Sequence, residues 1–485
     1  MKLCMFCLLA LFFLFVNSGC SESDVPIGYT FTLAVPVEYA NDFSSKAYLM
    51  ETDQMPLNFR TALSIEAIDG RYACSLEIFL GNVKVWSSGH RSKFYTSEMC
   101  MLELTKMGDL RLKGPNEAIG WRTGTSGQGV EVTPISKFRL ILVPNLTSSM
   151  QKLQLLESGN LVLVDTLGSI KWQTFNFPTN VLLEEQRLSV ATHLTSFPTN
   201  NSTSFFSFEI HHDKVALYLN PGDKDKYPYW ELKPPGARNI TFIELSSRGL
   251  ELFDDKYQKF SQILPQNSEP IRFLALDNST GNLDLYYYSP YNDKFEASYQ
   301  ALSSTCDLPL SCSPYEICTS SKTCSCIIWL LTKREDNSDS DCSKEISNVG
   351  LCGKNEVDML ELEDAGTLLK SESSLTNMSR RECANSCLND CNCAAAFYSS
   401  HARECMFYGF VRGAKQASRG SGLSYLVKVP KRVMTGNHKK SGLQNWALIL
   451  IVVADGLVIF RVLGGLGCFM VWKRRKRSTD GANGS

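Results

Sequence analysis

Cysteine is the residue type that gives the clearest chemical information in this sequence. The chain has 18 cysteines, of which three lie in the first 20 residues and one at position 468, which leaves 14 between them. An even number of cysteines in a secreted chain is typical of a disulfide framework, because thiols are oxidised outside the cell. We therefore expect disulfide bonds at these residues: Cys74, Cys100, Cys306, Cys312, Cys318, Cys324, Cys326, Cys342, Cys352, Cys383, Cys387, Cys391, Cys393 and Cys405.

Most of these cysteines fall into two clusters. The first, residues 306–342, has the spacing C-x5-C-x5-C-x5-C-x-C-x15-C, and the second covers residues 352–405. Segments this short bury too little apolar surface to fold alone, so covalent cross-links must replace a core. Cys383 and Cys387 are four residues apart, so a helix would place both sulfurs on one face. We expect two small modules with three disulfides each and a separate Cys74–Cys100 bridge.

Zinc binding is the alternative interpretation of the clusters. The C-x3-C and C-x-C spacings, with His401 nearby, contain the residue types of a tetrahedral zinc site. An even set of cysteines in a secreted chain forms bridges far more often than it binds metal, so we expect no metal.

Other residue types offer no catalytic set. None of the six histidines is accompanied by a G-x-S-x-G, H-E-x-x-H or P-loop motif. His211 and His212 are adjacent on an expected strand, so their side chains point to opposite faces and cannot bind one metal together. Asp254 and Asp255 are also neighbours, which gives no control over the separation of two carboxylates. We expect neither an enzyme nor a cofactor.

The elements that position these residues are mostly strands. Between residues 28 and 300, short alternating or β-branched runs are broken by Gly, Asn, Asp and Pro, a pattern typical of all-β domains. Residues 102–112 (LELTKMGDLRL) and 153–163 (LQLLESGNLVL) repeat one another as strand, turn and strand, and Trp121 and Trp172 follow them. This repeat indicates stacked hairpins around a shared aromatic core, with two unrelated hairpins as the alternative.

Two apolar segments indicate the compartment. Residues 1–20 have the short basic start and apolar run of a secretory signal peptide, and residues 446–472 are long enough to span a bilayer as one helix. Residues 473–485 follow as a cytoplasmic tail too short to fold or catalyse. We therefore expect a single-pass type I protein of the plasma membrane, with its N-terminus extracellular.

The glycosylation motifs agree with an extracellular chain. All six N-x-[ST] sequons lie between the signal peptide and the expected membrane helix. The expected glycosylation sites are Asn145, Asn200, Asn201, Asn239, Asn278 and Asn377.

Charge excludes one class of partner. The net charge is -1, from 49 basic and 50 acidic residues, and no basic stripe is interleaved with aromatic residues. A phosphate backbone requires such a basic surface, so we do not expect nucleic acid as a partner.

Asp455 and Arg461 lie inside the expected membrane helix, where each charge costs about 2.5 to 3.5 kcal/mol. They are six residues apart, so they point about 120° away from each other and pair poorly within one helix. A partner helix with complementary charge is one explanation, and snorkelling of both side chains to the interfaces is the other.

Several segments resemble one plant family. LQLLESGNLVLVD (residues 153–165) and WQTFNFPTNVLL (172–183), with VWSSGHR (85–91), are similar to the bulb-type lectin domain of S-locus glycoproteins and S-domain receptor-like kinases. CDLPLSCSPYEICTSSKTCSC (306–326) is similar to their EGF-like module, and ECANSCLNDCNCAAAFYSSHARECMFY (382–408) to their PAN/apple module. The segments follow the order of the family.

The resemblance implies a mostly β fold with a defined order of domains. After the signal peptide, we expect a bulb-type lectin-like β-prism domain at 28–185 and a β-rich S-locus glycoprotein-like region at 186–300. A disulfide-rich EGF-like module at 304–345 and a PAN/apple domain at 350–430 would precede the single transmembrane helix.

The resemblance also implies how the cysteines pair, which their spacing leaves open. In the EGF-like module it implies Cys306–Cys318, Cys312–Cys324 and Cys326–Cys342. In the PAN/apple module it implies Cys383–Cys405, Cys387–Cys393 and Cys352–Cys391.

The sequence departs from the family at the sugar site. The family's mannose motif is Q-x-D-x-N-x-V-x-Y, whose polar side chains bond sugar hydroxyls. Here the register places Leu156, Ser158, Asn160, Val162 and Val164 at these positions, and the earlier repeat places Thr105, Met107, Asp109, Arg111 and Lys113 there. Apolar replacements would leave sugar hydroxyls unpaired at about 1 to 3 kcal/mol each, so we expect mannose binding to be weak or lost.

The second departure is that the sequence continues into no kinase, so we expect a member of the family without kinase activity. We expect a recognition or co-receptor module whose partner is a receptor kinase or a second copy of the chain, bound through the PAN/apple module and the membrane helix. The alternatives are a lectin with a non-standard sugar site and a surface glycoprotein without a ligand.

Overall fold

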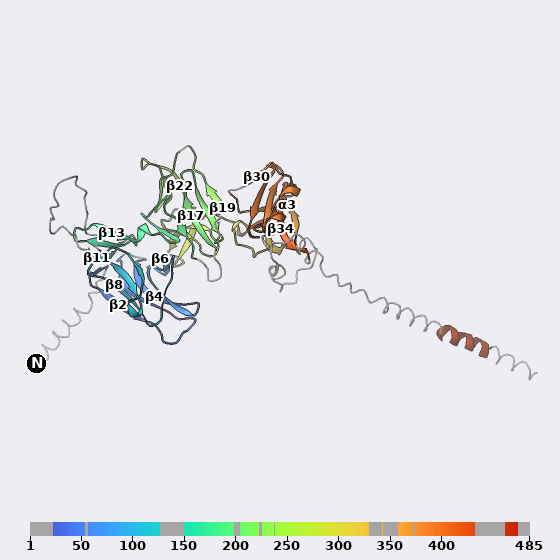
Figure 1. Ribbon diagram of the computed structural model, residues 1–485, viewed down its shortest axis with the longest axis horizontal. Coiled ribbons are helices and arrows are strands. Elements are labelled where there is room, and N and C mark those ends of the chain that lie inside the picture. Colours follow the sequence, from blue (N-terminus) through green and yellow to red (C-terminus); the bar gives the residue numbers. More distant parts are fainter. Residues whose placement is uncertain are drawn as a thin grey trace, which may run out of the picture.

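The computed structural model describes residues 23–53, 57–126, 150–197, 204–222, 226–236, 238–328, 342, 357–371, 374–431 and 461–473. Most of these residues lie in antiparallel sheets, so the chain is mostly β, as expected. Two β units and a C-terminal block follow one another along the long axis of the molecule (Figure 1).

The first unit consists of three antiparallel sheets, each built on four strands. Each of the first three strands joins one sheet, and the other three strands of that sheet follow later as a meander. The first sheet contains β1 (Asp24–Pro26), β11 (Met150–Leu155), β12 (Leu161–Asp165) and β13 (Ile170–Gln173). The second contains β2 (Thr30–Ala34), β8 (Met99–Leu104), β9 (Leu110–Lys113) and β10 (Ile119–Arg122). The third contains β3 (Ser44–Glu51), β4 (Phe59–Ile68), β5 (Arg71–Leu80) and β6 (Val83–Ser87), with β7 (Phe94–Thr96) beside β5.

A tryptophan from each sheet meets the other two. Trp86 of β6, Trp121 of β10 and Trp172 of β13 lie edge to face, with ring centroids 5.9 to 6.2 Å apart. The edge-to-face arrangement matches the quadrupoles of aromatic rings and adds to the energy of burial. The aromatic core expected from the two repeats is therefore present, and Trp86 is a third member that the repeat did not reveal.

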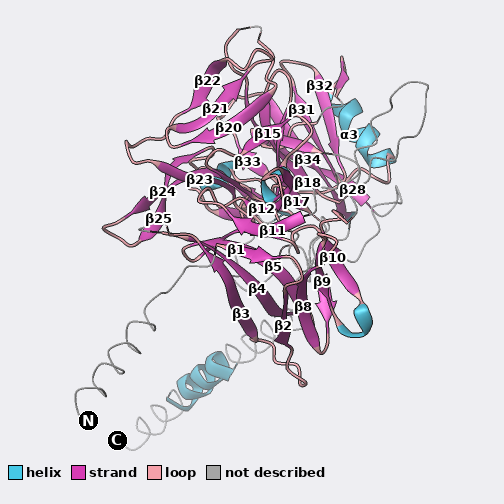
Figure 2. Ribbon diagram, turned by 90° about the vertical axis from the view of Figure 1, so that its left-hand side faces the viewer, coloured by secondary structure: helices cyan, strands magenta, loops and turns pink. Residues whose placement is uncertain are grey.

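The second unit repeats this strand order, without a counterpart of β7 among the described residues. Its first sheet contains β14 (Val181–Leu183), β23 (Ile271–Leu276), β24 (Leu283–Ser289) and β25 (Lys294–Gln300). The second contains β15 (Arg187–Ser189), β20 (Phe242–Ser246), β21 (Gly249–Phe253) and β22 (Lys259–Ile263). The third contains β16 (Leu194–Thr195), β17 (Phe205–Ile210), β18 (Val215–Asn220) and β19 (Tyr227–Leu232). The labelled strands β20 to β25 of the second unit lie above strands β1 to β5 of the first unit in Figure 2.

The second unit is therefore another copy of the three-sheet fold, where the sequence indicated only a β-rich region at 186–300. Its interior is lined by Leu, Ile, Val and Phe side chains rather than by three tryptophans, which hides the relationship in the sequence. Val181–Leu183 lies within the expected first domain at 28–185, yet it pairs with β23 and belongs to the second unit.

The C-terminal block joins the EGF-like and PAN-like segments. The PAN-like sheet contains β28 (Val357–Glu363), β34 (Leu423–Pro430), β31 (Ala395–Ser399), β32 (Glu404–Tyr408) and β30 (Leu375–Thr376), and helix α3 (Arg380–Asn389) packs on it. A mixed sheet combines β26 (Glu316–Cys318) and β27 (Cys324–Cys326) of the EGF-like segment with β29 (Ala365–Thr367) and β33 (Ala414–Gln416). Ile317 pairs in parallel with Ala414, so the two small modules share backbone hydrogen bonds.

The disulfides hold this block together. The structure pairs Cys306 with Cys318, Cys312 with Cys324, Cys326 with Cys342, Cys383 with Cys405 and Cys387 with Cys393, as the resemblance implies. Cys391 is also disulfide-bonded, and its expected partner Cys352 lies outside the described residues. In the first unit, Cys74 of β5 is bonded to Cys100 of β8 and links two sheets.

Helix α3 begins at a capping box. The Ser379 hydroxyl accepts a hydrogen bond from the backbone N–H of Glu382, and the Glu382 carboxylate accepts one from the backbone N–H of Ser379. These bonds satisfy two N–H groups that a helix start leaves free. Cys383 and Cys387 are both fully buried on the inner face of the helix, as their spacing predicted.

The second half of the expected membrane helix is described, and residues 461–473 are helical. Within the described part of the chain, no helix is long and apolar enough to cross a membrane. Residues 446–460, which include Asp455, lie outside that part.

Candidate functional site

The β11–β12 hairpin carries the residues that align with the family's mannose motif. Asn160, the one amide that the sequence retains there, forms its hydrogen bonds within the protein. Asn160 is buried, and its Nδ2 donates to Gln173 Oε1 at 2.8 Å. Its Oδ1 accepts from Thr174 Oγ1 at 3.1 Å and from the backbone N–H of Phe175 at 3.2 Å. Asn160 therefore ties the hairpin to the end of β13, and these bonds leave little of its amide for a sugar.

The rest of this register is apolar or closely packed. Val162 and Val164 are buried, while Leu156 and Ser158 are half-buried. Gly159 has a φ of +80°, and a Cβ there would lie 2.5 Å from the Phe59 ring. Only glycine fits this turn without displacing the ring.

The residues that align with the mannose motif on the β8–β9 hairpin also form hydrogen bonds within the protein. The buried Asp109 accepts hydrogen bonds from Thr123 Oγ1, from Gly124 N and from Thr125 N at 2.8 to 3.2 Å. Thr105 Oγ1 accepts from the Asp109 N–H, and the Met107 side chain is 66% exposed.

Ion pairs occupy the remaining two positions of that register. Arg111 Nε and Lys113 Nζ contact Glu103 Oε2 at 2.9 and 3.1 Å, and Lys113 also pairs with Glu117. The sequence therefore placed these side chains at one hairpin correctly, but their polar atoms bind one another.

A third hairpin of this kind was missed in the sequence. The turn Gly281-Asn282-Leu283 between β23 and β24 matches Gly159-Asn160-Leu161 and Gly108-Asp109-Leu110, and all three glycines have positive φ. Asn282 Nδ2 donates to the Leu302 carbonyl at 2.9 Å, and Oδ1 accepts from the Leu302 N–H at 3.0 Å. The G-[ND]-L triplet is the signal that would have found it. The same register on this hairpin places Asn278, Thr280, Asn282, Asp284 and Tyr286 at the motif positions.

Asp284 is the one carboxyl among these five residues, and its pKa is raised. Tyr286 donates to its Oδ2 at 3.2 Å, whereas Oδ1 has no hydrogen-bond partner among the described residues. Burial raises the pKa of Asp284 to about 6, with a smaller contribution from the nearby Asp277. The Tyr286 ring stacks on Phe273, which packs into the core of the first unit, so this face of β24 is turned toward the first unit.

The two units meet along a seam formed by β6 and the segments around β14 and β16. Trp86 Nε1 donates to the Phe177 carbonyl at 2.9 Å, and Thr179 Oγ1 donates to the Val85 carbonyl at 3.2 Å. His90 Nε2 lies 2.8 Å from Thr195 Oγ1. Burial and the neighbouring Arg91 lower the pKa of His90 to about 4, so this imidazole is neutral at neutral pH.

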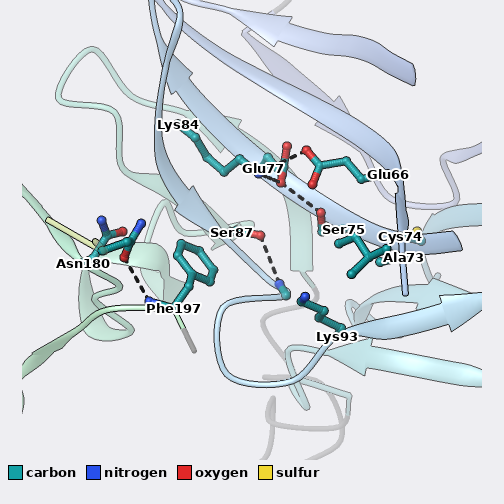
Figure 3. A pocket seen from close by; sticks show the side chains of 13 residues that line it. Glu66, Ala73, Cys74, Ser75, Glu77, Lys84, Ser87, Lys93, Asn180 and Phe197 are labelled. Carbon is teal, nitrogen blue, oxygen red and sulfur yellow. Dashed lines mark hydrogen bonds and ion pairs between the residues drawn. The ribbon is translucent and has the colours of Figure 1, made fainter. Parts of the chain in front are cut away.

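A cavity of about 370 Å³ opens at this seam and is the candidate functional site (Figure 3). Ligand cavities occur preferentially where two structural units meet. The wall on the first unit is the outer face of β4, β5 and β6 with the loop after β6, and the opposite wall comes from the second unit. We call it the seam cavity. It is lined by Glu66, Ile68, Ala73, Cys74, Ser75, Glu77, Lys84, Ser87, Gly89, Lys93, Asn180, Phe197 and Asn278.

Charged groups on the first unit converge in the seam cavity. Lys84 Nζ lies 2.6 Å from Glu77 Oε1 and 3.4 Å from Glu66 Oε1, and Ser75 Oγ donates to Glu77 Oε1 at 3.1 Å. Burial alone would lower the pKa of Lys84, but the two carboxylates outweigh it and raise that pKa above 10.5. Glu77 is only 1% exposed, and its second oxygen Oε2 has no partner within the described structure. An unpaired buried carboxylate oxygen is costly, so a hydrogen-bond donor in the cavity would be stabilised there.

A second cavity of about 380 Å³ lies beside the expected sugar register. It is lined by Phe59 and residues 156–158 of the first unit, and by Glu184, Glu185 and Arg272 of the second. Residues of the second unit therefore lie across this cavity from the turn at residues 156–158.

The remaining candidate residues are not brought together into a catalytic set. His211 and His212 lie just beyond the end of β17 rather than on a strand, and His211 Nε2 lies 2.8 Å from the Tyr218 hydroxyl oxygen. Asp254 Oδ1 accepts from the backbone N–H groups of Lys256 and Gln258, which makes it a turn residue, and Asp255 is exposed.

Three of the six glycosylation sequons are described. Asn239 and Asn377 are exposed, whereas Asn278 is half-buried in the seam cavity. Asn145, Asn200 and Asn201 lie outside the described residues.

Comparison with known proteins gives consistent relatives. A family model described as a PAN-like domain matches residues 363–429. A PAN domain-containing protein of Arabidopsis thaliana is 27% identical over 78% of this chain and 73% of its own length. An S-locus-specific glycoprotein of Brassica oleracea var. alboglabra is 23% identical over 74% of this chain and 82% of its own length.

Other relatives are longer proteins. A G-type lectin S-receptor-like serine/threonine-protein kinase of Arabidopsis thaliana is 24% identical over 68% of this chain, but the match covers only 42% of that kinase. The chain therefore spans less than half the length of this relative. Among solved structures, a monomeric mannose-binding lectin of Gastrodia elata covers 31% of the chain at 16% identity, with a TM-score of 0.18.

Two three-sheet units followed by joined EGF-like and PAN-like modules define a chain of the S-domain type. Along most of its length the chain is similar to S-locus glycoproteins and to a PAN domain-containing protein, and these similarities support an S-locus and PAN-type protein. The S-locus and PAN relatives do not bear enzyme names, whereas other relatives are named as kinases.

Proposed function

We propose that the protein is a recognition or co-receptor module of the plant cell surface, which binds a receptor kinase ectodomain or a second copy of itself through the PAN-like module. The observation that carries the proposal is the rigid joint between this module and the second three-sheet unit. Tyr227 of β19 packs against Tyr408 and Phe410, and the Lys370 N–H donates to the Pro228 carbonyl at 2.9 Å. A single core runs through the second unit, the EGF-like segment and the PAN-like module.

A rigid block of this kind presents a protein-binding face in a defined orientation. Binding then costs less entropy than it would with modules on flexible linkers. The exposed face of α3 is a suitable contact, because Cys383 and Cys387 hold the helix to the sheet while Arg381 and Asn385 are exposed.

In this proposal the protein is anchored as a single-pass type I membrane protein. The signal-like residues 1–20 and the apolar residues 446–472 support that placement. Asp455 and Arg461 would contact a partner helix of complementary charge.

The test is co-isolation from membranes with the full chain and with an Arg381→Glu plus Asn385→Arg variant. We expect the variant to recover a kinase, or a second tagged copy, at least fivefold less well. Lys256→Glu, an exposed change in the β21–β22 turn, is the matched control and should change nothing. Equal recovery by all three chains would contradict binding through this face of the PAN-like module.

Membrane placement needs its own measurement. Extraction at alkaline pH and protease protection of the residue 473–485 tail distinguish an anchored type I chain from a secreted one. Release of the full chain by alkaline buffer would overturn the anchor.

Glycan binding at a non-standard site is the second candidate function. The unpaired Glu77 Oε2 in the seam cavity favours it, because sugar hydroxyls are donors. Binding of glycans to the purified chain, lost in a Glu77→Gln variant, would establish this alternative.

A further inference from the structure

Asn278 differs from the other described sequon asparagines in its surroundings. Asn239 and Asn377 are exposed, so a glycan on either extends directly into solvent. Asn278 is half-buried and lines the seam cavity between the two units. A sugar on Asn278 needs space beyond its amide, and the cavity of about 370 Å³ supplies room for one sugar residue.

The backbone around this sequon is held in one conformation. Asp277 Oδ1 accepts hydrogen bonds from the backbone N–H groups of Ser279 and Thr280 and from both of their hydroxyls, at 2.7 to 3.0 Å. The backbone N–H of Phe197 donates to Asn278 Oδ1 at 2.9 Å. The oxygen of the Asn278 amide is thus engaged, while its nitrogen Nδ2 is the atom that carries an N-linked sugar.

The cavity offers a sugar residue both polar and apolar contacts. Glu77 Oε2 is buried without a partner among the described residues, and a hydroxyl group can donate to it. Phe197 and Asn180 stand on one side of the cavity, and Glu66, Glu77 and Lys84 stand on the other (Figure 3). Asn278 lies beside Phe197, because its Oδ1 accepts the hydrogen bond from the Phe197 backbone N–H.

We propose that the first sugar residue of an N-linked glycan on Asn278 occupies the seam cavity, where one of its hydroxyls donates to Glu77 and joins the two three-sheet units. The glycosidic bond forms between Asn278 Nδ2, which loses one proton, and C1 of the sugar, whose lipid pyrophosphate carrier leaves. The inference rests on the extracellular placement in the proposed function, because this transfer takes place in the secretory pathway.

The first experiment measures occupancy and protection on the full chain made in plant cells. Mass spectrometry of glycopeptides should find sugar on Asn278, Asn239 and Asn377. A peptide N-glycosidase should release the Asn278 glycan from the native protein at least tenfold more slowly than the Asn239 glycan, and at the same rate after denaturation.

Two results overturn the inference and differ in what else they affect. Occupied Asn239 and Asn377 with an empty Asn278, or equally fast release at Asn278, would overturn the cavity proposal alone. All three asparagines unmodified would also overturn the extracellular placement, and with it the proposed function.

A variant pair tests the contact to Glu77. Glu77→Gln nearly preserves the side-chain volume and removes the charge, and it should speed release of the Asn278 glycan about tenfold. Glu251→Gln is the matched control, since Glu251 is also paired with a lysine, at 3.1 Å from Lys259, but lies on β21 away from the cavity. Unchanged release in Glu77→Gln would remove Glu77 from the proposed contact.

If Glu77→Gln does not fold, the thermal midpoint gives a second test. Asn278→Asp keeps the oxygen that accepts from the Phe197 N–H and removes the glycan. Its unfolding midpoint should fall by several degrees, whereas Asn239→Asp should leave the midpoint unchanged. Equal midpoints in the two variants would show that the glycan does not join the units.

Discussion

Tyr227 of the second three-sheet unit packs against Tyr408 of the PAN-like module, with the ring centroids 5.6 Å apart. Both side chains are buried, and the Tyr408 hydroxyl donates to the Leu369 carbonyl at 2.8 Å. Beside them, Lys370 Nζ lies 3.1 Å from Glu231 Oε2. Residues nearly two hundred positions apart thus form one core. The EGF-like and PAN-like modules therefore cannot move independently of the second unit without exposing this core to solvent.

Tyr227→Ala should uncouple the PAN-like module from the second unit. Removing a large buried ring costs about 3 to 5 kcal/mol of stability. The Tyr227 ring packs where the second unit contacts the PAN-like module, so the change weakens that contact. We expect calorimetry to show a separate, earlier transition and limited proteolysis to cut between residues 300 and 360 more readily. Tyr291→Ala is the control, because Tyr291 is 96% exposed; an equal effect in both variants would contradict the joint.

Asn160→Ala should act on stability rather than on sugar binding. The change removes a buried amide and leaves Gln173, Thr174 and the Phe175 N–H without their partner, at about 2 to 3 kcal/mol. Denaturant unfolding of the chain measures the loss. Ser158→Ala in the same turn should cost less than about 0.5 kcal/mol, and a loss of glycan binding without a loss of stability in Asn160→Ala would contradict the structural role.

Asp284 should make the protein less stable as the pH rises. Its pKa is about 6 in the folded chain and 3.8 in the unfolded chain, so between these values only the folded state holds the proton. Stability contributed by the protonated carboxyl is present below pH 4 and lost as the pH rises through 6, with a slope of at most about 1.4 kcal/mol per pH unit. Unfolding midpoints of Asp284→Asn, compared with the native chain between pH 4 and 7, should lack this loss.

His90 should have the opposite effect in an overlapping range. Its pKa is about 4 when folded and 6.5 when unfolded, so between these values only the unfolded state is protonated. Stability is therefore complete above pH 6.5 and falls as the pH drops toward 4. Substitution by Gln should remove the part of this fall that His90 causes, so the variant should lose less stability than the native chain between pH 6.5 and pH 4. A variant with the same pH profile as the native chain would show that His90 is not buried in its neutral form.

The cysteine pattern, the apolar segments and the repeated hairpins could be interpreted from the sequence, because each is a local signal. Cys383 and Cys387 are four residues apart, and that spacing alone places them on one helix face. The repeat at 102–112 and 153–163 predicts an aromatic core, because turn glycines and strand alternation are encoded within about ten residues.

The tertiary structure decided what no local pattern contains. The second unit shares the topology of the first, but its core has Leu, Ile, Val, Phe and Tyr side chains in place of the three tryptophans. Pairing such as that of β14 with β23 joins strands about ninety residues apart. The seam cavity and the shifted pKa values of His90 and Asp284 arise from the contact between the units, because burial there depends on side chains brought together only by the fold. Glu77, Asn278 and Phe197 are ordinary in the sequence, and their role as walls of one cavity follows from that contact.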